Sequence, residues 1–391
     1  MIYVHVPFCR SFCTYCDFYS EIASKCRGCQ DDERIIRYSD SLVREIELRK
    51  KEIEAVASAE NTVNTLYIGG GTPSVLPLSV LRQALQALET AGVRSQYKEF
   101  TVEVNPEDIV EKGPEYVEQL LKMGVNRVSM GVQSFDDGIL KWMNRRHNAD
   151  TAVKAYNILE TVGVENISID LIFGFPQLTP SLWDETLEKA ISISSKGNLP
   201  KHISSYQLSV EPGSALASLL EKGAWDEAAD DVCEVQYSHL CQVLKSAGYH
   251  HYEISNFALP GYEAVHNSAY WRHVPYVGLG PGAHSFIIDG GYVRKWNEPD
   301  LVSYENAMSS GDISLVQGGE ILDREQIAIE KIMLALRTSD GVPERYLWDN
   351  CLASKVEGAL SSGNLIRTGH DMIRIPEEKF FVSDGTISSI L

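Results

Sequence analysis

The sequence has no block of lysine or arginine and no long apolar run. Its 391 residues include 54 acidic and 35 basic side chains, so the formal net charge is −19. Nonspecific nucleic-acid binding depends on clustered basic residues that neutralise phosphates, so we expect no nucleic-acid partner. A membrane-spanning helix needs about 20 consecutive apolar residues, and the N-terminus has no signal-peptide pattern. We therefore expect a cytoplasmic protein without a transmembrane segment and leave peripheral membrane association open.

Cysteine is scarce outside the N-terminal region, where five of the eight cysteines lie within 29 residues. Cys9, Cys13 and Cys16 form a C-x3-C-x2-C run. A disulfide framework would be spread along the chain, so this crowding favours metal or cluster binding. Three thiolates can hold three irons of a 4Fe-4S cluster and leave the fourth iron open to a small molecule. Structural zinc takes four ligands, which Cys26 and Cys29 could complete. The spacing alone leaves both alternatives open.

Strand-like segments alternate with helix-like segments over the first 210 residues. Six strands separated by helices predict parallel pairing with right-handed crossovers. Polar or Gly-rich residues follow the strands, as in "GGGTPS", "EVNP" and "GVQSF", and (β/α) barrels assemble their active sites at that end. We therefore predict an α/β fold with a partial (β/α)6 barrel, rather than a doubly wound sheet that binds its ligand at one crevice. The expected strands are residues 2–6, 65–69, 99–105, 127–133, 167–175 and 202–210.

The alternation weakens after about residue 210, and the chain is longer than one hydrophobic core usually fills. We predict a barrel core in residues 1–210 and an extension in residues 211–315, which contains "HNSAYW" and "GLGPGAHS". Residues 316–391 are predicted to form a small, mainly helical domain that resembles a winged helix. Its expected elements are helices at 323–337 and 356–364 and strand-like pieces at 372–376 and 379–383.

Several segments resemble one known superfamily. "CRSFCTYC" is similar to the C-x3-C-x2-C signature of the radical S-adenosylmethionine (SAM) superfamily, in which an aromatic residue, here Tyr15, often precedes the third cysteine. "GGGTPS" resembles the Gly-rich segment that contacts the amino group of SAM in that superfamily. The likeness extends through "EVNP", "GVQS", "DLIFGFP" and "GLGPGAHSF", so it covers most of the chain. Within the superfamily, the chain is most similar to the oxygen-independent coproporphyrinogen III oxidase group and, in that group, to its branch of heme chaperones.

The resemblance implies a cofactor site. Cys9, Cys13 and Cys16 would ligate a 4Fe-4S cluster, and SAM would bind the open iron through its amino and carboxylate groups. Glycine lets the backbone approach closely, carboxylates accept hydrogen bonds from ribose or ammonium, and a guanidinium pairs with a carboxylate. Taken singly, the acidic residues could instead cap helices and the arginine could form a surface ion pair. The expected SAM-site residues are Tyr3, Tyr15, Gly70, Gly71, Thr72, Glu103, Gln133, Arg145, Asp170 and Ser204.

The oxidase and chaperone branches differ in two features. The oxidase branch has a fourth cysteine two residues after the third, where this chain has Phe18, and it has an N-terminal extension that we do not find. "HNSAYW" resembles the HNxxYW motif of the chaperone branch, which is associated with heme. His266 is then the expected axial heme ligand, with Tyr270 and Trp271 beside the macrocycle. Taken alone, a histidine in an aromatic segment is often only a hydrogen-bonded structural residue.

These observations predict a heme chaperone that binds a 4Fe-4S cluster, SAM and heme, and that transfers heme to acceptor hemoproteins such as respiratory ones. We assign no catalytic residue and do not expect coproporphyrinogen oxidase activity. The alternatives are anaerobic oxidative decarboxylation of coproporphyrinogen III and a zinc-stabilised binding module. Cys26 and Cys29 have no expected counterpart in either branch; the pair could bind a second metal, complete a zinc site, form a redox pair or be an idle insertion.

Overall fold

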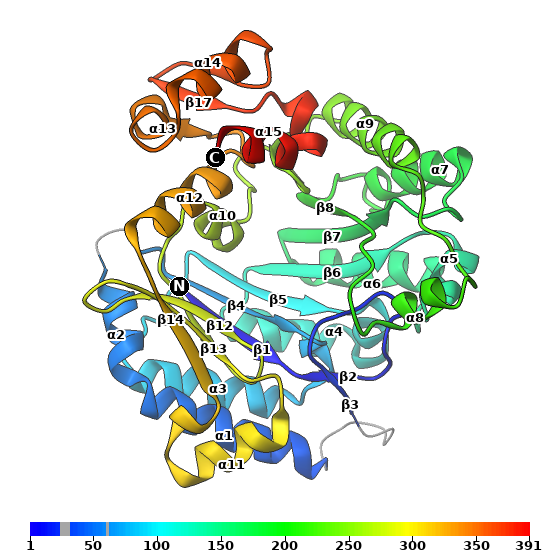
Figure 1. The fold of residues 1–391 in the computed structure, drawn as a ribbon. Coiled ribbons are helices and arrows are strands. Elements are labelled where there is room, and N and C mark those ends of the chain that lie inside the picture. The colour runs from blue at the N-terminus through cyan, green and yellow to red at the C-terminus, as the bar shows by residue number, and fades with distance from the viewer. Residues whose placement is uncertain (24–31, 60–61) are drawn as a thin grey trace.

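The computed structural model describes residues 1–23, 32–59 and 62–391. Its centre is a nine-stranded sheet in the order β11-β1-β4-β5-β6-β7-β8-β10-β9, and the six strands from β1 to β8 in this order run parallel (Figure 1). The predicted partial (β/α)6 arrangement is therefore confirmed. The six strands are β1 (Ile2–Val6), β4 (Thr65–Gly70), β5 (Glu99–Val104), β6 (Arg127–Gln133), β7 (Asn166–Phe173) and β8 (His202–Gln207).

The helices that connect these strands lie along the outer side of the curved sheet (Figure 1). Their apolar stripes face the sheet, as in α1, where Ile35, Leu42 and Ile46 are buried. Helix α6 is flanked by Asn148, whose side chain accepts from the Thr151 amide, and by Gly163, which is left-handed. These helices are α1 (Glu33–Leu48), α2 (Lys50–Ser58), α3 (Leu78–Thr90), α4 (Pro106–Lys122), α5 (Asp137–Trp142), α6 (Ala149–Val162) and α7 (Pro180–Ile191).

The two faces of the sheet differ in polarity because side chains alternate along each strand. In β5, Phe100 and Val102 are buried in the apolar core that the sheet shares with the helices, whereas Glu103 lies on the inner face. In β7, Ile169 belongs to the core and Asp170 faces inward. The parallel register then brings inner-face side chains of neighbouring strands together, and it pairs Glu103 with Ser129 and Asp170 with Ser204. The interior of the barrel is therefore polar.

Helix α10 (Val265–Trp271) lies where the parallel strands begin, opposite the end at which they terminate (Figure 1). The amides of Val265 and His266 donate to Glu99, the first residue of β5, at 2.7 and 2.9 Å. Along the chain, the other elements between β8 and β12 are α8 (Ala215–Glu221), α9 (Asp230–Ser246), β9 (His250–Glu253), β10 (Asn256–Ala258) and β11 (Val277–Leu279).

The rest of the chain forms two small antiparallel sheets with further helices. In the first sheet, β14 pairs with β13. These strands lie on either side of residue 316, where we expected the C-terminal domain to begin. The division into three domains stays a prediction. The elements of this part are β12 (His284–Ile288), β13 (Tyr292–Asn297), α11 (Leu301–Ser310), the 3-10 helix η2 (Ile313–Leu315) and β14 (Gln317–Leu322).

The C-terminal part has the helix and strand order of a winged helix, with its strands in the order β15-β17-β16. The expected strand at 379–383 is wrong, because η3 places Phe380 in the core as part of a 3-10 helix. No helix in the described part of the chain is long and apolar enough to cross a membrane. The elements are α12 (Arg324–Ala335), β15 (Val342–Pro343), α13 (Glu344–Asn350), α14 (Ala353–Ser361), β16 (Ile366–Thr368), β17 (Met372–Arg374), η3 (Glu377–Val382) and α15 (Ser383–Ile390).

Candidate cofactor site

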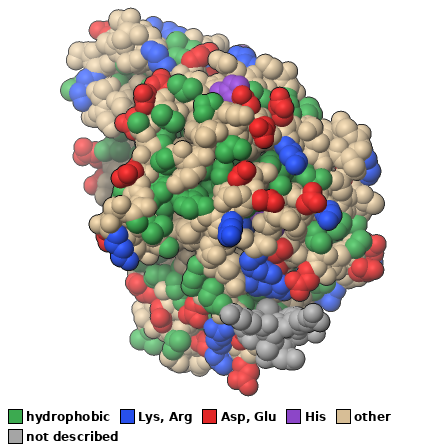
Figure 2. Space-filling view, turned by 90° about the vertical axis from the view of Figure 1, so that its right-hand side faces the viewer, with side chains coloured by type: hydrophobic (Ala, Val, Ile, Leu, Met, Phe, Trp, Pro, Cys, Tyr) green, Lys and Arg blue, Asp and Glu red, His purple; other side chains and the backbone are tan. Residues whose placement is uncertain are grey.

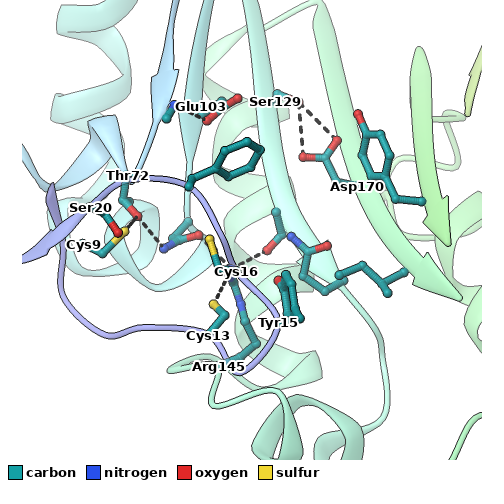
Figure 3. A pocket seen from close by; sticks show the side chains of 18 of the residues that line it. Cys9, Cys13, Tyr15, Cys16, Ser20, Thr72, Glu103, Ser129, Arg145 and Asp170 are labelled. Atoms are coloured by element: carbon teal, nitrogen blue, oxygen red, sulfur yellow. Dashed lines mark hydrogen bonds between the residues drawn. The ribbon is translucent and has the colours of Figure 1, made fainter. Parts of the chain in front are cut away.

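A pocket of about 410 Å³ opens at the carboxyl ends of the parallel strands (Figure 3). Its wall is formed by the cysteine loop, which joins the strands β2 (Phe8–Cys9) and β3 (Glu21–Ile22), and by the inner faces of β4 to β8. This is the end at which (β/α) barrels bind ligands. Most of the expected site residues meet here. The expected residues that line the pocket are Cys9, Cys13, Tyr15, Cys16, Gly70, Gly71, Thr72, Glu103, Gln133, Arg145, Asp170 and Ser204.

The Gly-rich segment after β4 packs directly against the cysteine loop. The amide of Gly71 donates to the carbonyl oxygen of Val6 at 2.8 Å, and the amide of Thr72 donates to that of Phe8 at 2.7 Å. A Cβ atom at Gly71 would lie 2.7 Å from the Phe8 oxygen, so no larger residue fits without moving the loop. Gly70 has a φ of 104°, which favours glycine. The glycines therefore let this segment pack closely against the cysteine loop, and they leave no side chain on this part of the pocket wall.

The three cysteines of the loop are free thiols whose side chains surround one space (Figure 3). The sulfur of Cys9 also lies 3.3 Å from the Thr72 hydroxyl. No group of three His, Cys, Asp or Glu side chains in residues 1–23, 32–59 and 62–391 could hold a single metal ion. A 4Fe-4S cluster offers a separate iron to each thiolate, so its ligands need not converge on one point. The three thiols therefore suit a cluster.

Arg145 lies between the cysteine loop and the strand ends. Its Nη1 donates to Cys13 Sγ at 3.4 Å, and its Nη2 donates to the Asn105 side chain and to the Gly131 carbonyl, both at 2.7 Å. Its Nε is buried and has no hydrogen-bond partner among the residues that the structure describes. A buried donor without a partner is costly unless a ligand satisfies it. The guanidinium is therefore placed to pair with a carboxylate next to the cysteines, and it is not part of a surface ion pair.

The two acidic residues of the site are buried on the inner face of the barrel. Glu103 accepts from the Tyr67 hydroxyl at 2.6 Å and from the Gly70 amide at 3.1 Å, and burial raises its pKa to about 7. Asp170 accepts from the Ser129 hydroxyl at 3.3 Å, and burial raises its pKa as well. Neither residue caps a helix. Both can accept hydrogen bonds from a ligand's ammonium or hydroxyl groups.

Gln133 and Ser204 complete the predicted set on neighbouring strands. Gln133 ends β6 with a φ of 67°, which is rare for a residue with a side chain and is found most often at functional sites. Ser204 is buried beside Asp170 and stabilises the ionised form of that carboxyl through a hydrogen bond.

Other lining residues were missed by the sequence analysis. Asn105 joins Arg145 to Thr72 through its side-chain oxygen and nitrogen. The quoted segment "EVNP" contains this residue, so its place at a strand end could have identified it. Four others are Tyr67, Arg127, Ser129 and Asn267. The first three occupy inner-face positions, and the alternation of polar and apolar residues along β4 and β6 was the available signal.

Tyr3 and His266 are the two expected site residues that do not line the pocket. The Tyr3 hydroxyl instead bonds His5 Nδ1 at 3.0 Å. His266 is fully buried, its Nδ1 lies 2.8 Å from the Thr65 hydroxyl, and its Nε2 lies 2.9 Å from the Tyr270 hydroxyl. Burial lowers the pKa of His266 to about 3. An axial ligand needs a free ring nitrogen, so this conformation does not present His266 to iron.

The Cys26 and Cys29 pair lies outside the described residues.

The mouth of the pocket carries exposed aromatic side chains. Phe12 and Phe18 of the cysteine loop are 50 % and 64 % exposed, and Tyr206 at the end of β8 is 44 % exposed. Figure 2 shows the face on which the strands end, where hydrophobic side chains gather in the middle among charged ones.

Comparison with known proteins agrees with this geometry. Residues 3–190 match the model of the radical SAM superfamily. The heme chaperone HemW of Lactococcus lactis is 32% identical over 87% of this chain and 82% of its own, and that of Mycobacterium tuberculosis is 32% identical over 100% and 94%. The solved structure of the coproporphyrinogen III oxidase HemN from Escherichia coli, a radical SAM enzyme, is 20% identical, covers 99% of this chain and 89% of its own, and superposes with a TM-score of 0.76.

Proposed function

Because this chain belongs to the HemW family within the radical SAM superfamily, we propose that it is a heme chaperone, which binds heme and transfers it to acceptor hemoproteins. The observation that carries the proposal is the similarity to HemW proteins over 87–100% of the chain. The departure from the oxidase branch at Phe18, where that branch has a cysteine, supports it. The fold shared with HemN does not decide between the branches.

A 4Fe-4S cluster and SAM fit the residues of the pocket. Cys9, Cys13 and Cys16 would hold the cluster, and the unpartnered Nε of Arg145 would meet the SAM carboxylate. In this superfamily the bound cluster and SAM together supply one-electron chemistry. The chain itself contributes the orientation of SAM, through Arg145 and the buried acceptor Glu103.

The partners and location follow from this role. We propose that the acceptors are hemoproteins, respiratory ones among them, and that the protein works in the cytoplasm, where thiols stay reduced. Three free thiols around one space support that location, because they would oxidise in an oxidising compartment. Peripheral association with a membrane stays a prediction that depends on where the acceptor sits.

The test is a transfer assay with the full chain after cluster reconstitution. The protein is loaded with hemin and mixed with apomyoglobin as a generic acceptor, and absorbance reports the myoglobin spectrum. We expect transfer faster than from a hemin-loaded protein of similar size and charge that has no chaperone role. A parallel anaerobic assay supplies coproporphyrinogen III, SAM and a reductant. Decarboxylated porphyrin without accelerated hemin transfer would overturn the chaperone proposal in favour of the oxidase.

A further inference from the structure

Arg127, the first residue of β6, is a buried cation that the proposed function does not use. The residue is only 1% exposed. A guanidinium keeps its charge in proteins, and burying a charge without an ionic partner lowers the stability of the fold. Arg127 forms no ion pair within residues 1–23, 32–59 and 62–391. In this part of the chain, no acidic side chain at contact distance therefore balances its charge.

The hydrogen bonding of this guanidinium is incomplete as well. Its Nη2 lies 3.4 Å from Nδ1 of His202, whose ring also bonds Ser168 and Tyr252. Burial, and after it the charge of Arg127, lowers the pKa of His202 well below its usual range, so this partner is neutral. Nε and Nη1 of Arg127 are buried and have no partner among the described residues. Two donors of a charged group are therefore left without an acceptor there.

The acidic residues on the inner side of the strands serve other donors. Both oxygens of Glu99 accept amides of α10. Glu103 accepts from a tyrosine hydroxyl and a backbone amide, and Asp170 accepts from a serine hydroxyl. An unsatisfied buried donor is costly unless a ligand supplies the acceptor. The structure therefore offers Arg127 no acceptor from these three carboxylates.

Arg127 lies at the floor of the cofactor pocket, far from the open end. It lines the same cavity as Arg145, and so does Asn267 of α10, the helix at the amino end of the strands. On β6, Arg127 is four residues before Gly131, whose carbonyl oxygen accepts from Arg145. At about 3.3 Å per residue, the two positions are about 13 Å apart along the strand. The pocket therefore has one arginine near its mouth and another at its floor.

The pocket wall above Arg127 is polar and partly acidic. Tyr67, Ser129 and Ser204 bring hydroxyl groups to it from three strands, and Figure 3 shows Ser129 beside Asp170. Hydroxyl groups favour a ligand that can form hydrogen bonds. The acidic side chains repel a doubly charged anion such as phosphate, whereas one guanidinium matches the single charge of a carboxylate.

We infer that the floor of the cofactor pocket is a subsite for a small polar carboxylic acid, whose carboxylate accepts from Nε and Nη1 of Arg127. Hydroxyl or amino groups of the acid bond the hydroxyl groups of the wall above, and Asn267 bounds the subsite below. The subsite is distinct from the place where Arg145 would meet the SAM carboxylate, so both ligands bind at once. The inference goes beyond heme transfer and does not depend on it.

The test measures how sodium L-lactate, which has one carboxylate and one hydroxyl, stabilises the cluster-reconstituted full chain. Urea unfolding in sodium chloride of equal ionic strength is the reference, and sodium phosphate is run in parallel. A ligand that binds only the folded protein raises the unfolding midpoint by a constant step for each tenfold rise in its concentration above Kd. We expect this response to lactate without SAM and with saturating SAM.

Two variants of Arg127 separate a ligand group from a structural one. Arg127→Met should abolish the response, and without ligand it should be at least as stable as the parent, because an apolar group replaces an unpaired buried charge. Arg127→Lys keeps the charge but changes the donors, and it should bind lactate at least tenfold more weakly. Arg82→Met, on the exposed side of α3, is the matched control and should respond like the parent.

Several results would overturn the inference. If lactate stabilises the parent no more than chloride does, or phosphate acts in its place, the floor does not bind a carboxylic acid. A response that persists in Arg127→Met arises elsewhere, and one that SAM abolishes belongs to Arg145. If Arg127→Met fails to fold, Arg127→Lys decides, because an unchanged affinity for lactate would make Arg127 a structural residue. None of these results concerns hemin, so the chaperone function is tested separately.

Discussion

Two buried side chains at opposite ends of the barrel, Arg145 and His266, differ in how their polar atoms are satisfied. At the carboxyl end, Arg145 has a buried nitrogen without a partner and Glu103 has a raised pKa. At the amino end, both ring nitrogens of His266 are bonded, and Glu99 accepts the amides that begin α10. A buried polar group with a hydrogen-bond partner stabilises the fold. A buried polar group without one lowers the stability of the fold, unless a bound ligand supplies the partner. The difference indicates that Arg145 is open to a ligand, whereas His266 fixes helix α10 in place as a structural plug at the amino end.

The largest expected effect lies in the cysteine loop. Cys13→Ala should lose nearly all of the reconstituted cluster. The loop supplies three thiolates, and without one of them the cluster keeps only two protein ligands. Iron and acid-labile sulfide content, with the visible absorbance of the reconstituted protein, measure the loss. Cys351→Ala, a half-buried thiol of the C-terminal part, is the control and should retain the cluster. A fully loaded Cys13→Ala protein would contradict the assignment of the loop.

The next effect concerns the plug. His266→Ala should lower the free energy of unfolding by about 3 kcal/mol, because it removes two buried hydrogen bonds and leaves a cavity against Tyr67 and Tyr270. Urea unfolding of the cluster-loaded protein, followed by circular dichroism, measures it. The exposed His284→Ala should stay within about 0.5 kcal/mol of the parent. Equal stability of the two variants would mean that the amino end is not a plug.

At the carboxyl end, Arg145→Gln should weaken SAM binding by roughly ten- to a hundredfold, since a hydrogen bond to a charged group contributes about 1.5–3 kcal/mol. Titration calorimetry on the cluster-loaded protein gives the Kd. Arg82→Gln is the control, because Arg82 is exposed and donates to Gln119 on the surface, away from the pocket. An unchanged Kd at normal cluster content would show that Arg145 serves the loop and not the ligand.

The smallest effect is a pH dependence of stability. Burial raises the pKa of Glu103 from 4.5 to about 7, so between these values the folded protein holds a proton that the unfolded chain releases. The stabilisation from this proton is complete below pH 4.5 and is lost as the pH rises through 7, with a slope of at most about 1.4 kcal/mol per pH unit. Glu103→Gln should remove this part of the slope when unfolding is measured at pH 5, 6 and 7.5.

The exposed Glu118→Gln provides the comparison for that series. It should follow the parent protein at every pH, because this side chain is more than half exposed on the surface of α4. If Glu103→Gln also keeps the parent's slope, then water reaches this carboxyl and the carboxyl end is less dry than its burial indicates.

Short segments of the sequence were enough to predict the strands of the barrel and several residues of the cofactor site. The six strands were recognisable because short β-rich segments recur along the chain and helix-like segments separate them. Cys9, Cys13 and Cys16 were identified because their ligand role depends on spacing within one loop. Thr72 and Glu103 were found at strand ends, where this fold places its ligands.

Tertiary structure decided the rest, because contacts between distant segments are not written in local spacing. Asn105 and Arg145 meet only because neighbouring strands end side by side. The same holds for His266: its motif is visible in the sequence, but whether its ring faces iron or Thr65 depends on how α10 docks against the first residues of β4 and β5. The sequence by itself determined the barrel and the cluster ligands; the packing of α10 decided which polar groups are satisfied within the fold and which remain open to a ligand.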